Sequence, residues 1–409
     1  MSIASHREGP FPNLDAYRGI GNLMVMTTHV AFAAGMRGKS EFLNRFLARL
    51  DIAIPIFFLV SGFLLFRPYA SALYGDRGWP STRDYFRNRA LRILPVYWLA
   101  MITVMLWFGV PRIADAGPFS SHPFGGIAYY GLMLQTFTAQ HFTNFDKFDQ
   151  SWSIGTEVTF YAILPFLAMG WRRWAAGRDA AGVRRVLLTG CAVLWVIAQL
   201  WRTGMAGLNP SWAPSAAFWL PAHLDFFAVG MAMATWNAGT KAGLPLPRWI
   251  DRLAAAPGAA WAIALALWLV VVDVLGVISL FQIRSSPLDF SEEYVAKTLM
   301  YGIIGFFAVL PAVFGPQREG LIRRFLGSTP MVAIGLISLG SYLWHKAWLA
   351  QGELWTGAAP FQGSFIPLWL ITVAGGLGSG LLCYWFVERP LMARKVRRST
   401  LSRPDPVAA

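Results

Sequence analysis

Apolar stretches of bilayer-spanning length recur along the whole chain, and they restrict its possible folds more than any other feature. A helix needs about 20 apolar residues to cross the hydrocarbon core of a membrane. Eleven segments meet or approach this length, at residues 14–34, 52–69, 93–111, 125–139, 152–170, 186–201, 214–236, 257–281, 295–314, 331–350 and 366–387. Because lipid offers no hydrogen bonds to the backbone, the pattern predicts an all-α, polytopic membrane helix bundle.

Composition excludes the other broad classes of protein. Of the 409 residues, 56% are hydrophobic and 14% are charged, whereas soluble domains carry about 25% charged residues. The net charge of +14 could fit a nucleic-acid partner. The basic residues, however, lie in short loops between apolar segments, as topology signals do. We therefore expect the lipid bilayer as a partner and no nucleic acid. Cys191 and Cys383 lie in separate apolar segments, which predicts free core thiols.

Two arginine-rich loops orient the bundle. They lie at residues 67–92 and 172–185, and the positive-inside rule places both in the cytoplasm. Three apolar segments separate them, so one of the three cannot cross the membrane. Segment 125–139 is short and contains Gln135, which predicts a re-entrant or half-depth element buried by protein or water. The prediction is about ten transmembrane helices plus this segment, with both termini in the cytoplasm.

The same reasoning divides the chain into three parts. Residues 1–13 predict a cytoplasmic N-terminal segment without the features of a cleaved signal. Residues 14–390 predict the membrane domain, and residues 391–409 a basic, disordered cytoplasmic tail.

One loop does not fit the predicted topology. The loop between the first two spans lies on the predicted outer side, yet its cations outnumber its acids. Either the local topology is wrong or the cations serve an outward-facing site. The residues concerned are Arg37, Lys39, Arg45 and Arg49, against Glu41 and Asp51.

The first apolar segment carries ionisable residues that a membrane helix rarely contains. Arg18 and His29 are eleven residues apart, which places them on one helix face and about 16 Å apart along the axis. Asp15 precedes Arg18 by one turn and is placed to pair with it. Two alternatives stay open: Arg18 extends to the cytoplasmic interface, and His29 is a hydrogen-bonded interior histidine.

Glu157 lies in the stretch SWSIGTEVTFYAILPF, residues 151–166. A carboxylate in an apolar helix must be neutral or paired with another helix, and Arg18 and His29 are candidate partners. A purely structural pairing between helices is the alternative.

A polar stripe follows in the segment 331–350. Ser338, Ser341, Tyr342 and His345 have the spacing i, i+3, i+4 and i+7 and share one helix face. The alternative is anchoring at the outer membrane boundary, where tyrosine, tryptophan and lysine gather.

Arg89 and Arg92 lie one turn apart before a span on the cytoplasmic side and can hold one polyanion with forked donors. The alternative is plain positive-inside charge. His223 and Asp225 lie together in an apolar segment, where core pairing is as good an interpretation as function. No metal-ligand spacing and no phosphate-loop or nucleophile-elbow motif occurs in the sequence.

Six stretches, in this order, resemble motifs of the acyltransferase-3 family of integral membrane O-acyltransferases. They are LDAYRGIGNLMVMTTH from residue 14, FFLVSGFLLFRPY from 57, RNRALRILPVYW from 87, SWSIGTEVTFY from 151, SYLWH from 341 and VERP from 387. The resemblance extends from about residue 14 to 390. Many members have acidic residues where Pro55 and Val158 stand here, so a mechanism that uses either carboxylate does not carry over. Some members also have a hydrolase-like domain that this sequence lacks, and we expect the reaction to finish within the membrane domain.

The resemblance implies transfer of an acyl group, commonly acetyl, from acyl-coenzyme A to a hydroxyl of a sugar, glycolipid, polysaccharide or secondary metabolite. Acyl-coenzyme A is then a co-substrate, and no bound cofactor or metal is expected. The protein is expected in the cell (inner) membrane as a multi-pass protein. A secondary transporter or flippase with an intramembrane proton relay is the main alternative, and a non-catalytic membrane scaffold is another.

The resemblance also implies roles for individual residues. His29 acts as general base or acyl relay, and Glu157 orients it or contacts the acceptor hydroxyl. Arg18 steadies the donor, while Arg89 and Arg92 bind the polyanionic acyl-coenzyme A. The other residues expected to line the site are Asp15, Ser61, Trp152, Ser153, Tyr342 and His345.

Overall fold

The computed structural model describes residues 11–36, 41–110, 124–137, 145–208, 213–273, 292–359 and 361–393. These residues form helices, turns and loops without a strand, which confirms the all-α prediction for the described part of the chain. The terminal segments 1–10 and 394–409, the predicted outer acidic loop around Asp289, and Arg37 and Lys39 lie outside it.

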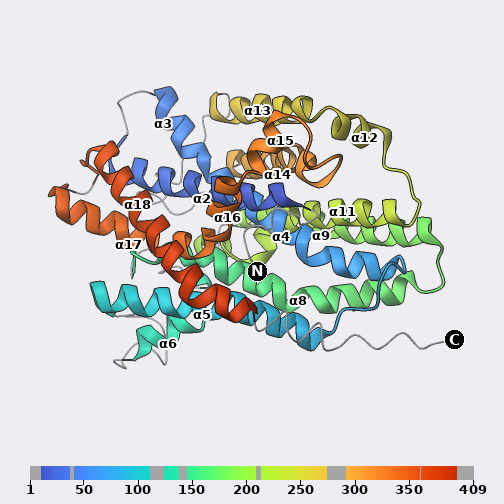
Figure 1. Cartoon of the computed structure of the whole chain (residues 1–409), viewed down its shortest axis with the longest axis horizontal. Helices are drawn as coiled ribbons and strands as arrows, with labels where there is room; N and C mark the ends of the chain where they lie inside the picture. Colours follow the sequence, from blue (N-terminus) through green and yellow to red (C-terminus); the bar gives the residue numbers. More distant parts are fainter. Residues whose placement is uncertain are drawn as a thin grey trace.

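The α-helices are α2 (Pro12–Ala33), α3 (Glu41–Ala48), α4 (Ala53–Leu73), α5 (Thr82–Phe108), α6 (Gly125–Gly131), α8 (Trp152–Ala175), α9 (Ala180–Leu208), α10 (Ala213–Ala216), α11 (Leu224–Lys241), α12 (Arg248–Ala255), α13 (Pro257–Asp273), α14 (Glu292–Val313), α15 (Leu321–Leu326), α16 (Thr329–Leu336), α17 (Ser338–Thr356) and α18 (Phe365–Cys383). Short 3₁₀ turns cover Arg49–Ile52, Leu134–Phe137, Asp149–Ser151 and Leu220–His223, and a π-helical turn covers Tyr384–Glu388. Most of the long helices run along the long axis of the molecule in a single bundle (Figure 1).

Six helical stretches of the described residues are long and apolar enough to cross a membrane, or seven if the bent pair α12–α13 counts as one span. They include α4, α5, α8, α9, α14 and α18. Helices α2, α11 and α17 are not among them, although the sequence analysis counted each as a span. The described chain is thus a multi-pass membrane helix bundle, while the count of ten spans and the cytoplasmic position of both termini stay predictions.

The described part of segment 125–139, residues 125–137, forms no membrane-length helix. It consists of α6 and the 3₁₀ turn Leu134–Phe137, and its polar group is buried by protein, as expected. Gln135 has no exposed surface and donates hydrogen bonds to the Tyr97 hydroxyl at 2.9 Å and the Ser151 hydroxyl at 3.0 Å. These bonds tie the short segment to α5 and to the start of α8.

Small residues allow the central helices to approach closely. Helices α4 and α11 form the most extensive pair in the bundle, and Gly62 and Gly230 lie at their crossing. A Cβ at Gly62 would overlap the backbone of Phe227, and one at Gly230 would overlap the backbone of Leu59. Membrane helices associate through such close backbone contact because lipid gives apolar side chains no reason to cluster. This crossing fixes α4, which carries one side of the cavity described below.

The helix predicted at residues 331–350 is broken into α16 and α17. Gly335 in the last turn of α16 lies against the backbone of Asp15, where a Cβ would overlap the main chain. The Ser338 hydroxyl donates to the Gly335 carbonyl oxygen at 2.8 Å across the break. Breaks of this kind typically occur at glycine and serine pairs. As a result α17 begins inside the bundle, beside α2.

Two cations of the loop that did not fit the predicted topology, Arg45 and Arg49, take part in contacts within the protein. Arg45 forms an ion pair with Asp273 of α13 at 2.7 Å. Arg49 is buried, and Asp51 pairs with the buried Lys297 of α14 at 3.1 Å. These contacts join α3 and the following turn to α13 and α14, so this loop has a tertiary role that the positive-inside rule does not consider.

Candidate active site

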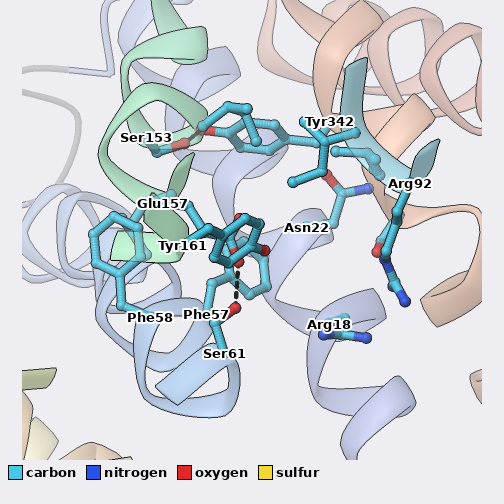
Figure 2. Close-up of a pocket in the computed structure, with 15 residues that line it drawn as sticks. Arg18, Asn22, Phe57, Phe58, Ser61, Arg92, Ser153, Glu157, Tyr161 and Tyr342 are labelled. Carbon is cyan, nitrogen blue, oxygen red and sulfur yellow. Dashed lines mark hydrogen bonds between the residues drawn. The ribbon is translucent and has the colours of Figure 1, made fainter. Parts of the chain in front are cut away.

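A cavity of about 90 Å³ lies among helices α2, α4, α5, α8 and α17, and Figure 2 shows the side chains that line it. Its polar lining residues are Arg18, Asn22, Ser61, Arg92, Ser153, Glu157, Tyr161, Ser338 and Tyr342. Apolar side chains complete the wall, namely Ile54, Phe57, Phe58, Ile93, Ile154 and Leu339. Ionisable groups inside a helix bundle are costly and gather where a ligand or ion is handled, so this cavity is the candidate active site.

Glu157 faces the cavity from the second turn of α8. Its carboxylate accepts a hydrogen bond from the Ser61 hydroxyl of α4 (Figure 2). The partner expected from the sequence was Arg18 or His29, and the observed one is Ser61. Arg18 shares the cavity with Glu157, whereas His29 is not in the lining.

Two arginines give the cavity an excess of positive charge. Arg18 lies 3.7 Å from the Asp15 carboxylate, which confirms the predicted pairing one turn apart. Arg92 lines the cavity from α5. Arg89, one turn nearer the start of α5, is not in the lining; its guanidinium lies 5.9 Å from the ring centroid of Tyr161. Two guanidinium groups and one carboxylate in the lining favour an anionic ligand with several oxygen acceptors.

The start of α17 adds to this positive character. Ser338 and Leu339, the first two residues of the helix, line the cavity. The N-terminal end of a helix carries a partial positive charge and favours anions. The break after α16 therefore places a helix N-terminus, with its partial positive charge, at the cavity. A continuous helix over residues 329–356 would have no N-terminus there.

Tyr342 closes one side of the cavity through a small hydrogen-bond network. Its hydroxyl donates to the backbone oxygen of Gln150 at 2.9 Å and lies 2.8 Å from the Ser153 hydroxyl. The Gln150 side chain donates to the Leu343 carbonyl oxygen at 2.7 Å. The start of α8 and the first turns of α17 are therefore held together at the cavity.

The two histidines singled out in the sequence form a pair outside the cavity. His29 Nδ1 of α2 lies 2.7 Å from His345 Nε2 of α17. Two turns before His29 on α2 and one turn before His345 on α17, the Asn22 amide donates to the Ser341 hydroxyl at 2.9 Å. Tyr342 lies between the two sites, because it lines the cavity and its ring centroid is 5.5 Å from that of His345.

The anchoring alternative for the polar stripe of α17 is wrong. Ser341 and His345 have no exposed surface, and Tyr342 is 6% exposed. Their polar groups contact α2 and the start of α8 rather than the membrane boundary. The stripe predicted from the spacing thus belongs to the interior of the bundle.

Trp152 does not line the cavity. Its ring packs against Phe218 and His223, with centroid distances of 4.8 and 5.5 Å. Asp225 forms an ion pair with Arg202 of α9 at 2.5 Å, and both side chains are buried. Core pairing is therefore the interpretation that holds for Asp225. No group of three or more His, Cys, Asp or Glu side chains in the described ranges could hold a metal ion.

Several residues of the cavity lining and of the core were not predicted from the sequence. Tyr161 follows Glu157 by four residues, and this spacing alone places it on the same helix face. Phe57 and Phe58 open the family-like motif FFLVSGFLLFRPY, but nothing marked them as lining residues, because phenylalanines are common in the apolar segments of this chain. Arg202 was also missed, although an arginine at the end of the apolar segment 186–201 called for a partner.

Comparison with known proteins gives two kinds of similarity. A family model described as an acyltransferase domain matches residues 11–388. Nodulation protein 10 of Rhizobium leguminosarum bv. viciae is 25% identical over 435 aligned positions, which cover 98% of each chain. The putative peptidoglycan O-acetyltransferase YrhL of Bacillus subtilis (strain 168) is 23% identical over 404 positions, which cover 94% of this chain and 55% of that protein. No solved structure matches the chain.

Proposed function

The chain belongs to the acyltransferase-3 family of membrane O-acyltransferases, and on that basis we propose that it moves an acyl group, acetyl in the simplest case, from acyl-coenzyme A to a hydroxyl. The acceptor is a sugar, glycolipid, polysaccharide or secondary metabolite. The observation that carries this proposal is the cavity in which Arg18 and Arg92 lie with the hydrogen-bonded pair Ser61–Glu157.

The donor end of the site consists of cations. Acyl-coenzyme A carries phosphates, which guanidinium groups bind through paired, charge-assisted hydrogen bonds. Arg92 and Arg18 supply such groups in the cavity, with the N-terminus of α17 beside them. Arg89 lies one turn nearer the predicted cytoplasmic end of α5, where it meets the donor before it enters.

The reacting end of the site is His29. Along α2, His29 lies about 16 Å from Arg18, as eleven residues of helix require. Coenzyme A fits such a separation because a long, flexible arm divides its phosphates from its thiol. A donor held by the arginines can therefore present its thioester toward the histidine pair.

The reaction needs one proton acceptor and one proton donor. His29 takes the proton of the acceptor hydroxyl while its oxygen attacks the thioester carbonyl carbon. A carbon–oxygen bond forms, the carbon–sulfur bond breaks, and the proton passes from His29 to the leaving thiolate. An acyl group held transiently on the imidazole is the two-step form of the same reaction. Glu157, held by Ser61 in the cavity with Arg18 and Arg92, orients the donor.

The name of one relative supports a carbohydrate acceptor, and the apolar helices fit the expected place in the cell (inner) membrane. One relative is named as a putative peptidoglycan O-acetyltransferase, which acts on a glycan. The family match does not support the transporter alternative.

Membranes that contain the protein, incubated with radiolabelled acetyl-coenzyme A, test the proposal. We expect label on a glycan or lipid fraction with the native chain and none with His29→Ala at equal expression. Mass spectrometry of surface glycans and glycolipids, from cells with and without the gene, then identifies the acceptor by the mass of one acyl group. Full transfer by His29→Ala would remove His29 from the mechanism, and uptake of an unmodified substrate without label transfer would favour a transporter.

A further inference from the structure

A chain of hydrogen-bonding groups continues from His29 into the protein interior. His29 Nδ1 lies 2.7 Å from His345 Nε2, and His345 Nδ1 lies 2.5 Å from the carbonyl oxygen of Tyr342. The two rings are within 7° of parallel. The proposed function uses His29 alone, so the role of the second histidine is open.

The chemistry of these atoms fixes where each proton lies. A backbone carbonyl oxygen can only accept, so His345 Nδ1 must carry a hydrogen. A neutral imidazole has one N–H group, which leaves His345 Nε2 with a lone pair. The nitrogen that faces this lone pair at 2.7 Å, His29 Nδ1, must then be the donor. His29 Nε2 is left unprotonated, on the ring edge that points away from His345.

The neutral form of His345 follows from its surroundings. The side chain has no exposed surface, and an imidazolium buried without a carboxylate partner is unfavourable. The neighbouring residue Lys346 is a cation, and the nearby carboxylate of Asp149 is already paired with it at 3.3 Å. His29 differs in being partly exposed.

The opposite tautomer of His29 does not fit this geometry. A hydrogen on Nε2 would leave a lone pair on Nδ1, directed at the lone pair of His345 Nε2. Two acceptors at 2.7 Å repel each other, so this tautomer requires the pair to separate. Separation is opposed by the packing of α2 against α17, and by the Trp369 ring N–H of α18, which donates to Thr27 Oγ1 of α2 at 2.9 Å.

We propose that His345 is a positioning residue that holds His29 in the tautomer with a free Nε2 lone pair; this inference rests on the proposed function. During attack, Nε2 takes the hydroxyl proton while the Nδ1 hydrogen stays shared with His345. The positive charge that forms on His29 is then stabilised by the lone pair of His345 Nε2. When the proton leaves for the thiolate, the original tautomer returns. A neutral histidine thus does the orienting that a carboxylate does in a Ser-His-Asp triad.

Two substitutions at residue 345 separate this role from simple packing. In His345→Gln the amide oxygen reaches about as far as the ring Nε2 and can accept from His29 Nδ1. In His345→Leu no acceptor remains. Ser341→Ala is the matched control, because it removes one hydrogen bond between the same two helices without contact to either histidine.

The measurement is kcat and KM for acetyl-coenzyme A with purified protein in detergent, together with the unfolding midpoint of each variant. We expect His345→Leu to lower kcat by about 100-fold, within the range typical of a lost general-base function, with little change in KM. The kcat of His345→Gln should be at least about 10-fold higher than that of His345→Leu, because the glutamine keeps a hydrogen-bond acceptor for His29. Ser341→Ala should stay within about 3-fold of the native kcat, since its hydrogen bond is only structural.

The possible results distinguish this inference from the proposed function. Native kcat in His345→Leu, with no transfer by His29→Ala, overturns the inference and leaves the role of His29 intact. Equal kcat values for the Gln and Leu variants, at similar unfolding midpoints, also overturn it, because the acceptor atom then has no effect. Full transfer by His29→Ala overturns both proposals.

Discussion

Arg92→Gln tests the donor site most directly. Arg92 lines the cavity from α5, and the glutamine removes its charge and its forked donor while keeping a polar side chain. A hydrogen bond to a charged group contributes about 1.5–3 kcal/mol, and each 1.4 kcal/mol is about tenfold in affinity. Arg92 is partly exposed, so water weakens the interaction and we expect the lower part of that range. The KM for acetyl-coenzyme A should rise about 10- to 30-fold.

The assay compares two donors with the purified protein in detergent. S-Acetylpantetheine has the same thioester and flexible arm but lacks the nucleotide phosphates. If Arg92 binds phosphate, the native protein has a lower KM for acetyl-coenzyme A than for S-acetylpantetheine. Arg92→Gln should then raise the KM for acetyl-coenzyme A and leave the KM for S-acetylpantetheine unchanged. Arg83→Gln is the matched control: it removes one exposed arginine from the same helix, outside the cavity.

Three results would refute this reasoning. An unchanged KM for acetyl-coenzyme A in Arg92→Gln would mean that the cavity does not bind the donor phosphates. An equal loss with both donors would place Arg92 at the thioester or in the fold rather than at a phosphate. If the KM for acetyl-coenzyme A rose as much in Arg83→Gln as in Arg92→Gln, the effect would come from the overall positive charge of the protein and not from Arg92 in the cavity.

Two further predictions concern the bonds that support the cavity. Ser61→Ala should lower the stability by about 1–3 kcal/mol, because the Glu157 carboxylate loses its hydroxyl donor; an unchanged unfolding midpoint in detergent would argue against this bond. Arg202→Met should destabilise the protein by about 3–5 kcal/mol by leaving Asp225 buried without its cation. Adding Asp225→Leu should recover part of that loss, and purely additive effects of the two substitutions would contradict the ion pair.

Features that depend on neighbouring residues along the chain were predictable from the sequence. The segment predicted at 52–69 is α4, Ala53–Leu73, because apolar length is a property of the segment itself. The pairing of Asp15 with Arg18 followed from their spacing of three residues. The absence of a membrane-length helix in residues 125–137 and the burial of Gln135 also followed from the short apolar length and the polar residue; the half-depth position stays a prediction. In each case the helix alone determines which groups are close.

Contacts between helices were not predictable in the same way. Ser61 and Glu157 are 96 residues apart, and His29 and His345 are 316 apart. Glu157 was recognised as a carboxylate that needs a partner, and Ser61, His29 and His345 as expected site residues, but which of them meet depends on how each helix is rotated about its axis. That rotation is set by packing, such as the contact between α4 and α11 at Gly230, which leaves no periodic signal in the sequence.

In the proposed mechanism, the geometry of α17 separates the place where the donor is bound from the place where the acceptor hydroxyl is activated. Ser338, Tyr342 and His345 share one face, since offsets of four and seven residues at about 100° each return close to the starting direction. The first two line the cavity, and the third meets His29. The rise from Ser338 to His345 is about 10 Å. The break after α16 sets where this helix begins, so a single rigid helix fixes the separation between the cation-lined cavity and the histidine pair.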